Sequence, residues 1–395
     1  MSLISRGAKG MKFIHTSDWH LGRIFHQTSL LADQQHLLDQ VFSHLQEQEA
    51  DALVIAGDIY DRSVPPASAV EVLDEFLDRV IQGLKIPVIL ISGNHDSAER
   101  LGFGSRQLQS AGLHILADLK TVDQPVTLET DGVQVDFYGL PYADPAQVRT
   151  LFADQLEDGQ VHCFNSAHQF LVEQVKQAAK TDRPKVLLSH CFLDGAAESD
   201  SERPLSIGGA DRVDWQPLAD FDYVALGHLH SPQYKGKPFI RYSGSLMKYS
   251  FSEATQNKSL TLVEINQEGL VGFELLPLKP RKDLRILEGD LKSLLEQGES
   301  DPHNEDFLLV RLTDSEALLE PMTQLRRVYP NVLHLEKTGF TSTSDLQLAR
   351  EKLKRGEVDM FQDFFHQVQG AKLSDEQLQV VRDVLEEIRQ EEAQG

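Results

Sequence analysis

Cysteine is nearly missing from this chain of 395 residues, which has only Cys163 and Cys191. Two cysteines cannot form a disulfide framework or a zinc–cysteine cluster. No apolar run approaches the roughly 20 residues that cross a bilayer, so no membrane contact is expected. The opening MSLISRGAKG lacks the apolar core of a secretory signal. We expect a soluble protein of the reducing cytoplasm. Residues 1–10 are interpreted as a disordered leader or cloning remnant before a start at Met11.

Positive charge is also scarce. The chain has 38 Lys and Arg against 61 Asp and Glu, a formal net charge of −23. Non-specific nucleic-acid binding depends on neutralising phosphates, so this balance argues against a uniformly basic surface. The charge balance is compatible with a local basic surface on this chain or with a partner that supplies one.

Short apolar runs alternate with amphipathic segments from Met11 to about residue 280. Unbroken Val, Ile and Leu runs predict strands buried on both faces. Leucine-rich helical spacing predicts helices over 28–48, 67–81 and 165–179. Strands and helices in this order indicate an α/β (α+β) domain over 11–280 with helices covering a central sheet.

A second region follows the segment PLKPRKD, whose two prolines mark a boundary. Residues 283–340 read as a small α/β domain, with helices near 291–295 and 317–328. The tail, 345–395, is predicted to be helical. Ser374 and Gln377 have the spacing of a capping box, and an apolar stripe follows at Leu378, Val381, Leu385 and Ile388. This stripe fits a docking surface or folding back onto its own domain equally well.

Five apolar runs end in side chains that can bind metal. Ligands bind beyond the carboxyl ends of strands in α/β sheets, so these groups are expected to converge. In chain order the groups are Asp18 with His20, Asp58, Asn94 with His95, His190, and His228 with His230.

The residue types fit a pair of metal ions. Residues i and i+2 of a strand face the same side, so Asp18 and His20 are expected to hold one ion together. The two oxygens of Asp58 could bridge both ions, which lie about 3.5–4 Å apart in two-metal sites. Mixed imidazole, carboxylate and amide donors favour manganese, iron or zinc over magnesium. His95 need not bind metal, and its chemistry suits either donation of a proton to a leaving oxygen or stabilisation of the charge that develops there.

Each motif is weak alone, and the set of five in order carries the interpretation. Asp61 could support the site or close a turn. His15 is expected to be packed or hydrogen-bonded, and Cys191 to lie in the core. The remaining histidines are expected at the surface: His26, His36, His44, His114, His162, His168, His303, His334 and His366.

The ordered motifs DWH, GDIYD, GNHD, a lone histidine and GHLH resemble the calcineurin-like metallophosphoesterase superfamily. That resemblance implies a double β-sandwich flanked by helices in place of one open sheet. The stretches TSDWHLG and GSLMKYSFSE further resemble the SbcD family, the nuclease components of the SbcCD complexes of DNA repair, recombination and replication.

The resemblance implies roles for single residues. One metal would be held by Asp18, His20, Asp58 and His230, and the other by Asp58, Asn94, His190 and His228. The ions would be Mn²⁺, and His95 would be the catalytic histidine. No role is assigned to Asp61, because some archaeal relatives have histidine at that position.

The resemblance also implies an assembly and a reaction. The small domain 283–340 would be a capping domain, and the helices of 345–395 would bind an SbcC-type ATPase. A homodimer, formed through helices at 67–81 and 98–111, would sit within a heterotetramer. The implied activity is hydrolysis of DNA phosphodiesters at ends and hairpins, as a double-strand exonuclease and single-strand endonuclease. Candidate DNA contacts are Arg23, Arg62, Arg100 and Arg106.

Two other functions are compatible with the same motifs. A metallophosphatase or small-molecule phosphodiesterase would keep the metals and change the substrate. A scaffold with a decayed site would lack ligands, whereas every expected ligand residue is present.

Overall fold

The computed structural model describes residues 10–180, 182–202, 211–316, 318–338, 374, 377–381 and 384. The chain divides into two compact units, Met1–Ile286 with Glu305–Leu308, and Leu287–Asn304 with Leu309–Gly395. Within the described ranges, no helix is long and apolar enough to cross a membrane.

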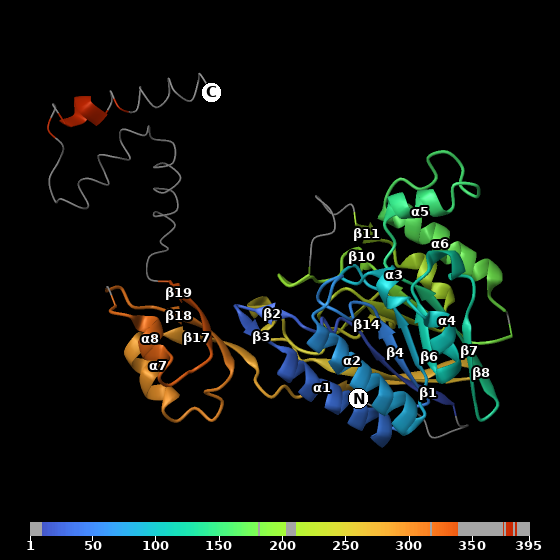
Figure 1. The fold of residues 1–395 in the computed structure, drawn as a ribbon, viewed down its shortest axis with the longest axis horizontal. Helices are drawn as coiled ribbons and strands as arrows, with labels where there is room; N and C mark the ends of the chain where they lie inside the picture. The colour runs from blue at the N-terminus through green and yellow to red at the C-terminus, as the bar shows by residue number, and fades with distance from the viewer. Residues whose placement is uncertain are drawn as a thin grey trace. The chain divides into compact units, whose positions relative to one another are not determined.

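The first unit is built on two six-stranded sheets (Figure 1). The first sheet has the order β16-β15-β1-β4-β5-β6. Its strands are β1 (Met11–Thr16), β4 (Ala52–Ala56), β5 (Val88–Ile91), β6 (Leu113–Leu116), β15 (Ser259–Asn266) and β16 (Gly269–Pro277). The second has the order β13-β14-β12-β9-β8-β7. Its strands are β7 (Val126–Thr130), β8 (Val133–Leu140), β9 (Lys185–His190), β12 (Tyr223–Gly227), β13 (Gln233–Lys235) and β14 (Lys237–Tyr242).

Parallel strands form the centre of both sheets. Strands β1, β4, β5 and β6 pair in parallel, as do β14, β12, β9 and β8. Antiparallel β15 and β16 extend the first sheet, and antiparallel β13 and β7 close the second. The carboxyl ends of parallel strands lie at one edge, so each sheet presents a set of loops there.

The two sheets face each other across a shared apolar core. Phe13 of β1 makes edge-on ring contacts with Phe137 of β8 and Tyr223 of β12, with centroids 5.4 and 5.7 Å apart. Side chains of β1, β4, β5, β8, β9 and β12 fill the same cluster. The expected double sandwich is confirmed.

Helices cover the outer faces of the sandwich. The helix α6 (Phe164–Ala178) packs its apolar face on the second sheet. The helices α1 (Leu31–Glu47) and α2 (Ala67–Asp78) lie over the first sheet (Figure 1). Short helix α5 (Pro145–Leu151) accompanies α6.

Several predicted helix boundaries differ from the structure. The segment 28–48 begins as a strand, because β3 (Thr28–Ser29) pairs with β2 (Ile24–Phe25) before α1 starts. The helix α2 is continued by a π-helix, Arg79–Leu84. The single helix expected over 98–111 is wrong. The segment contains α3 (Ala98–Leu101), α4 (Ser105–Leu108) and a 3-10 turn, Gln109–Ala111. Gly104, at φ +74°, interrupts the helical backbone.

Other predictions about buried residues are confirmed, with one exception. His15 is fully buried, and its Nδ1 accepts a hydrogen bond from the Tyr223 hydroxyl at 2.9 Å. Cys191 lies in the core beneath α6, beside the two-stranded pair β10 (Phe192–Leu193) and β11 (Arg212–Val213). His168 was expected at the surface and is instead buried on α6, where it contacts the Ser189 hydroxyl.

A three-stranded sheet follows the sandwich in the chain. Its order is β17-β18-β19, with β17 (Leu284–Gly289), β18 (Phe307–Leu312) and β19 (Val332–Lys337). Two helices accompany it, α7 (Leu291–Gly298) and α8 (Pro321–Leu325). The helix expected over 317–328 is shorter, since it begins at Pro321, a residue suited to the first helical turn.

Most of the tail, 345–395, lies outside the described residues, and so do residues 1–9. In the part described, Ser374 donates its backbone N–H to Oε1 of Gln377 over 2.9 Å. The N–H of Gln377 donates to the Ser374 hydroxyl over 3.3 Å, so the capping box is present. The division into domains at 11–280, 283–340 and 345–395 stays a prediction.

A candidate metal centre at the sheet edge

The five motif loops follow strands that end at one edge of the sandwich. β1 ends at Thr16, β4 at Ala56, β5 at Ile91, β9 at His190 and β12 at Gly227. The loops of the first sheet supply Asp18, His20, Asp58, Asn94 and His95. The second sheet supplies His190, His228 and His230.

Asp18 and His20 do converge on one point, but the predicted reason is wrong. Both lie beyond the end of β1 in left-handed backbone, with φ of 53° and 45°. Asp58 and His228 also have positive φ, 50° and 106°. Non-glycine residues adopt this region at an energetic cost and mainly where the surroundings enforce it. Four of the seven candidate ligands therefore sit on constrained turns rather than on strands.

Backbone hydrogen bonds hold these turns against each other. Asp18 donates its N–H to Gly57 O and His20 to Asp58 O, each over 3.0 Å. A Cβ added to Gly93 would come within 2.1 Å of Asp58 Oδ1. One added to Gly227 would come within 1.8 Å of Ala56 O. Glycine is required at both positions because the loops approach so closely.

Three side chains form the first group of potential ligands. Oxygen or nitrogen atoms of Asp18, His20 and His230 all lie within 4.8 Å of one another. The Nε2 atoms of His20 and His230 are 3.1 Å apart. Oδ2 of Asp58 is 3.6 Å from the His20 Nε2.

The second group shares Asp18 with the first and adds Asp58. Asp18, Asp58 and His190 offer ligand atoms within the same 4.8 Å limit. Oδ2 of Asp58 is 3.5 Å from Nε2 of His190. Asn94 Oδ1 lies 3.0 Å from both Nε2 of His190 and Nδ1 of His228. The same oxygen of Asp58, Oδ2, is therefore close to His20 of the first group and to His190 of the second, which is the place of a shared ligand.

Burial favours the neutral, metal-binding form of three of the imidazoles. Burial lowers the pKa of His190 to about 4 and that of His20 and His228 well below the usual value. Neutral rings present a lone pair, as metal coordination requires. The Nδ1 of His190 donates to Ala56 O over 2.9 Å, which leaves its Nε2 lone pair toward Asp58.

The carboxylates of Asp18 and Asp58 are buried close to each other. Burial first, and then the charge of Asp58, raise the pKa of Asp18 well above its usual range. Divalent cations would relieve this cost, since they supply the largest positive charge in such sites. The mixture of carboxylate, imidazole and amide donors fits divalent transition metals.

His95 lies beside the first group, and its backbone forms a hydrogen bond with Asp58. Its N–H donates to Asp58 Oδ1 over 2.9 Å, and its Nδ1 donates to Asp61 O over 2.8 Å. The His95 ring stacks edge-on against that of His20, 4.6 Å between centroids. The Nε2 atom remains for the reacting groups. His20, Asp61 and His95 also offer ligand atoms within 4.8 Å of one another.

Asp61 and Asp96 support the loops around His95. Asp61 Oδ1 accepts from the Arg23 guanidinium at 3.3 Å and lies 3.7 Å from Nδ1 of His20. Asp96 accepts backbone N–H groups of Ile59, Tyr60 and Gly93, which fastens the Asn94–His95 turn to the Asp58 turn. Burial and the neighbouring Asp58 raise the pKa of Asp96 to about 6.

Sequence reasoning missed a buried polar cluster behind His230. Ser201 contacts the His230 ring, and Glu253 and Lys258 pair behind Ser201. Glu253 stands in the quoted motif GSLMKYSFSE, which was the available signal. Ser201 belongs to no recognisable pattern.

The four candidate DNA-contacting arginines differ in their distance from the centre. Arg23 is held by Asp61 and lies over the Tyr249 ring, 5.0 Å from its centroid. Arg62 is exposed and lies 3.8 Å from Asp61. Arg100 and Arg106 are exposed on α3 and α4.

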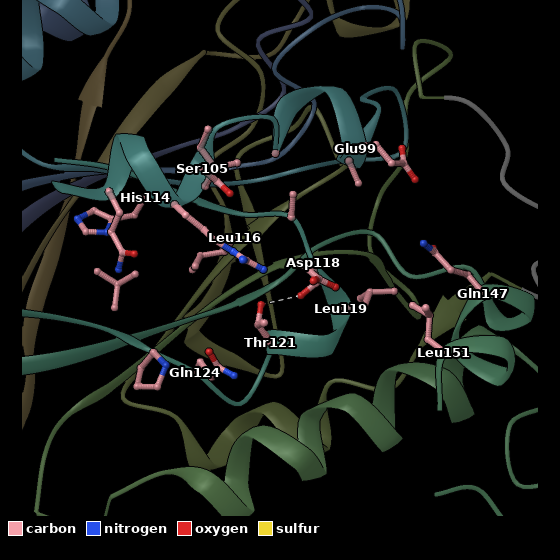
Figure 2. Close-up of a pocket in the computed structure, with 18 residues that line it drawn as sticks. Glu99, Ser105, His114, Leu116, Asp118, Leu119, Thr121, Gln124, Gln147 and Leu151 are labelled. Atoms are coloured by element: carbon pink, nitrogen blue, oxygen red, sulfur yellow. Dashed lines mark hydrogen bonds between the residues drawn. The ribbon is translucent and has the colours of Figure 1, made fainter. Parts of the chain in front are cut away.

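Arg106 lines a cavity that is separate from the metal centre. The cavity, about 620 Å³, lies between the α3–α4 segment, β6 and α5. Figure 2 shows Glu99, His114, Asp118 and Gln147 around it, with Thr121 donating to the Asp118 carbonyl over 3.0 Å. None of the candidate metal ligands lines this cavity.

Comparison with known proteins identifies the family. A model described as calcineurin-like phosphoesterase matches residues 11–232. A second, described as the type 5 capsule protein repressor C-terminal domain, matches residues 280–369.

Two curated relatives match over nearly full length. The SbcD component of the SbcCD nuclease of Staphylococcus epidermidis is 35% identical over 375 residues, 95% of this chain and 98% of the relative. The SbcD component from Staphylococcus saprophyticus is 33% identical over 382 residues, which is 96% of this chain and 99% of the relative. A dimetal phosphatase structure from Danio rerio covers 69% of this chain and 100% of its own, at 12% identity and a TM-score of 0.40. The sequence matches assign this chain to the calcineurin-like phosphoesterase family and, within it, to the SbcD nuclease family of metal-dependent hydrolases.

Proposed function

We propose that this protein is a two-metal DNA nuclease that hydrolyses phosphodiester bonds at DNA ends and hairpins, working with an SbcC-type ATPase. The observation that carries the proposal is the position of Asp58. Its Oδ2 lies 3.6 Å from Nε2 of His20 and 3.5 Å from Nε2 of His190. Ligand groups from both sheets thus gather around one carboxylate oxygen. The family of the relatives, SbcCD nucleases, supports DNA as the substrate class.

The proposed first site comprises Asp18, His20, Asp58 and His230, and the second Asp58, Asn94, His190 and His228. Divalent ions bound there would polarise the phosphoryl oxygens and lower the pKa of water toward neutrality. Nitrogen-rich shells of this kind favour Mn²⁺ over Mg²⁺, which prefers oxygen ligands. Mn²⁺ is therefore the metal proposed.

His95 is proposed to hold and deliver a proton. The carbonyl of Asp61 fixes its Nδ1–H, so the Nε2 of the imidazolium is left to donate to the leaving 3′ or 5′ oxygen. The backbone bond to Asp58 holds this ring at a constant position relative to the phosphate. Stabilising the charge on the leaving oxygen accelerates cleavage even before the proton is transferred.

The assembly is part of the same proposal. The relatives are named as a subunit of a complex, which supports a partner chain for this protein. We assign docking of an ATPase partner to residues 345–395 and a capping role to 283–340. A homodimer within a heterotetramer and a cytoplasmic location complete the proposal. The partner would supply basic surface that a chain of net charge −23 lacks.

A single assay separates this function from its alternative. An end-labelled DNA hairpin and a chromogenic phosphate monoester are incubated with the protein, with and without the ATPase, in Mn²⁺ or chelator. We expect manganese-dependent hairpin cleavage. Monoester turnover with the hairpin intact, even with the ATPase present, would reassign the site to a phosphatase.

A further inference from the structure

A buried chain of polar groups lies behind His230 on the side away from the proposed metals. The Nε2 of His230 points toward His20, and its Nδ1 lies 2.6 Å from the Ser201 hydroxyl. That hydroxyl donates in turn to Oε1 of Glu253. Glu253 is fully buried, and Ser201 and His230 are 6% and 1% exposed. Buried polar groups are normally paired, and here each group finds its hydrogen-bond partner in the next.

Lys258 completes the chain on the far side of Glu253. Its ammonium donates to Oε2 of Glu253 over 2.6 Å and to the backbone carbonyl of His230 over 2.7 Å. The backbone N–H of His230 donates to Oε1 of Glu202 over 2.8 Å. His230 is therefore held at its ring, its N–H and its carbonyl.

The direction of the hydrogen bonds follows from the end groups. The carboxylate of Glu253 only accepts, so the Ser201 hydroxyl must donate its hydrogen to Glu253. The oxygen of Ser201 is then an acceptor toward His230, and Nδ1 of His230 must carry the ring proton. The lone pair of the neutral ring is consequently at Nε2, which faces His20 and Asp58.

We propose that Ser201, backed by Glu253 and Lys258, is a positioning residue that fixes the tautomer and orientation of His230 for metal binding at Nε2. This inference rests on the proposed role of His230 as a ligand. Carboxylates placed behind metal-binding histidines commonly act in this way, here through an intervening hydroxyl. His190 is held differently, by the carbonyl of Ala56. A charged partner thus lies behind His230 and a neutral one behind His190.

Ser199 supplies a matched control. Its hydroxyl donates to Oε2 of Glu202 over 2.7 Å and lies 3.1 Å from Oε1 of Glu253 and 2.8 Å from the Ser201 hydroxyl, but it does not contact His230. Substituting it alters the same loop and the same carboxylate without removing the link to the ring.

The experiment measures Mn²⁺ binding to the full-length chain by calorimetry, with no nucleic acid present. We expect two ions in the wild type. In Ser201→Ala one site is expected to weaken by about 10- to 100-fold while the other is unchanged. Ser201→Thr, which keeps the hydroxyl, should restore binding, and Ser199→Ala should resemble the wild type. The thiol of Ser201→Cys has a similar volume and forms only weak hydrogen bonds. The Mn²⁺ affinity of this variant should therefore lie between those of Ser201→Ala and the wild type.

A second readout reports the tautomer directly. Ring nitrogen shifts of ¹⁵N-histidine protein should show the Nδ1–H form of His230 in the wild type and its loss in Ser201→Ala. Unchanged metal affinity and tautomer in Ser201→Ala would refute the inference, as would equal losses in Ser199→Ala. A wild type that binds two ions but leaves DNA intact would refute only the nuclease proposal. A wild type that binds no ion would overturn both.

Discussion

The backbone N–H of His95 donates to Oδ1 of Asp58 over 2.9 Å. The proposed proton donor is therefore attached by its main chain to the proposed bridging carboxylate. Every residue except proline retains that N–H, so the ring can be removed without taking away the hydrogen bond to Asp58. This separation makes the two roles independently testable.

We predict that His95→Ala lowers hairpin cleavage by about 10²- to 10⁴-fold, the usual contribution of a general acid. Metal content should stay at two ions, because the Asp58 contact is made by the backbone. Cleavage rates and metal content by mass spectrometry are compared with the wild type. Loss of an ion would make His95 a ligand and contradict its assigned role.

Asp58→Asn is predicted to remove both ions. The variant keeps the size of the side chain but loses the negative charge that faces His20 and His190. Binding of Mn²⁺ by calorimetry should fall at both sites. The control is Asp61→Asn, which lies at the edge of the first group and should retain at least the second ion. Retention of one ion in Asp58→Asn would show that this carboxylate does not bridge.

Gly227→Ala is predicted to destabilise the sandwich by about 3 kcal/mol or more, as close contacts in packed structure do. The added Cβ would stand 1.8 Å from Ala56 O and 2.9 Å from Nδ1 of His190. Urea unfolding followed by tryptophan fluorescence measures the effect. Gly83→Ala is the matched control, since nothing lies within 4 Å of its Cβ. Similar stability of the two variants would contradict the close approach of the loops.

Acid is predicted to destabilise the fold through His168. Burial lowers its pKa to about 4 from the ordinary 6.5, so the folded state holds the neutral ring. The stabilisation is complete above pH 6.5 and is lost as the pH falls toward 4, because only the unfolded state takes up the proton. The full difference between the folded and unfolded pKa values corresponds to about 3 kcal/mol in the free energy of unfolding.

His168→Gln should flatten this pH dependence. Urea midpoints are measured at intervals from pH 7.5 to 4 in chelator, so that metal does not contribute. The wild type and the variant should differ in slope between pH 6.5 and 4. Parallel curves would mean that His168 is charged in the folded protein.

Arg62→Ala is predicted to reduce the salt dependence of DNA binding. Removing one phosphate contact lowers the slope of log affinity against log salt by about 0.9. Arg62 is 66% exposed beside the centre. Arg79→Ala is the control, since Arg79 is also exposed, at 45%, and lies on the helical face, where it pairs with Asp39. Binding is measured in chelator to prevent cleavage. An unchanged slope would remove Arg62 from the DNA-binding surface.

The location of the motif-bearing loops at one edge could be predicted, because the carboxyl ends of parallel strands lie together. Asp58 and Asn94 each follow a short apolar run and a glycine, and that pattern alone locates them at the carboxyl edge. The backbone at Asp18 and His20 could not be predicted. Period-two alternation applies inside strands, and both residues lie in left-handed turns enforced by hydrogen bonds to the loop after β4.

Other errors have local causes. The segment 98–111 has helical composition, but Gly102 and Gly104 divide it into short turns. His168 shares the buried face of α6 with Leu171 and Val175, a helical spacing that could have placed it inside. Ser201 acts through residues about 30 and 50 positions away, and such contacts leave no local pattern.

The close contact between the two sheets' loops has a practical consequence. Each proposed metal site takes ligands from both sheets, so metal affinity reports how well the sheets are registered with each other. A mutation deep in the Phe13–Phe137 core that shifts one sheet slightly would raise the metal concentration needed for activity before it unfolds the protein. Such a variant would be scored as defective in low-manganese medium and as normal when manganese is supplied. A variant with a distant packing defect and a variant that lacks a ligand would then both be inactive in low-manganese medium. Only added manganese would distinguish them.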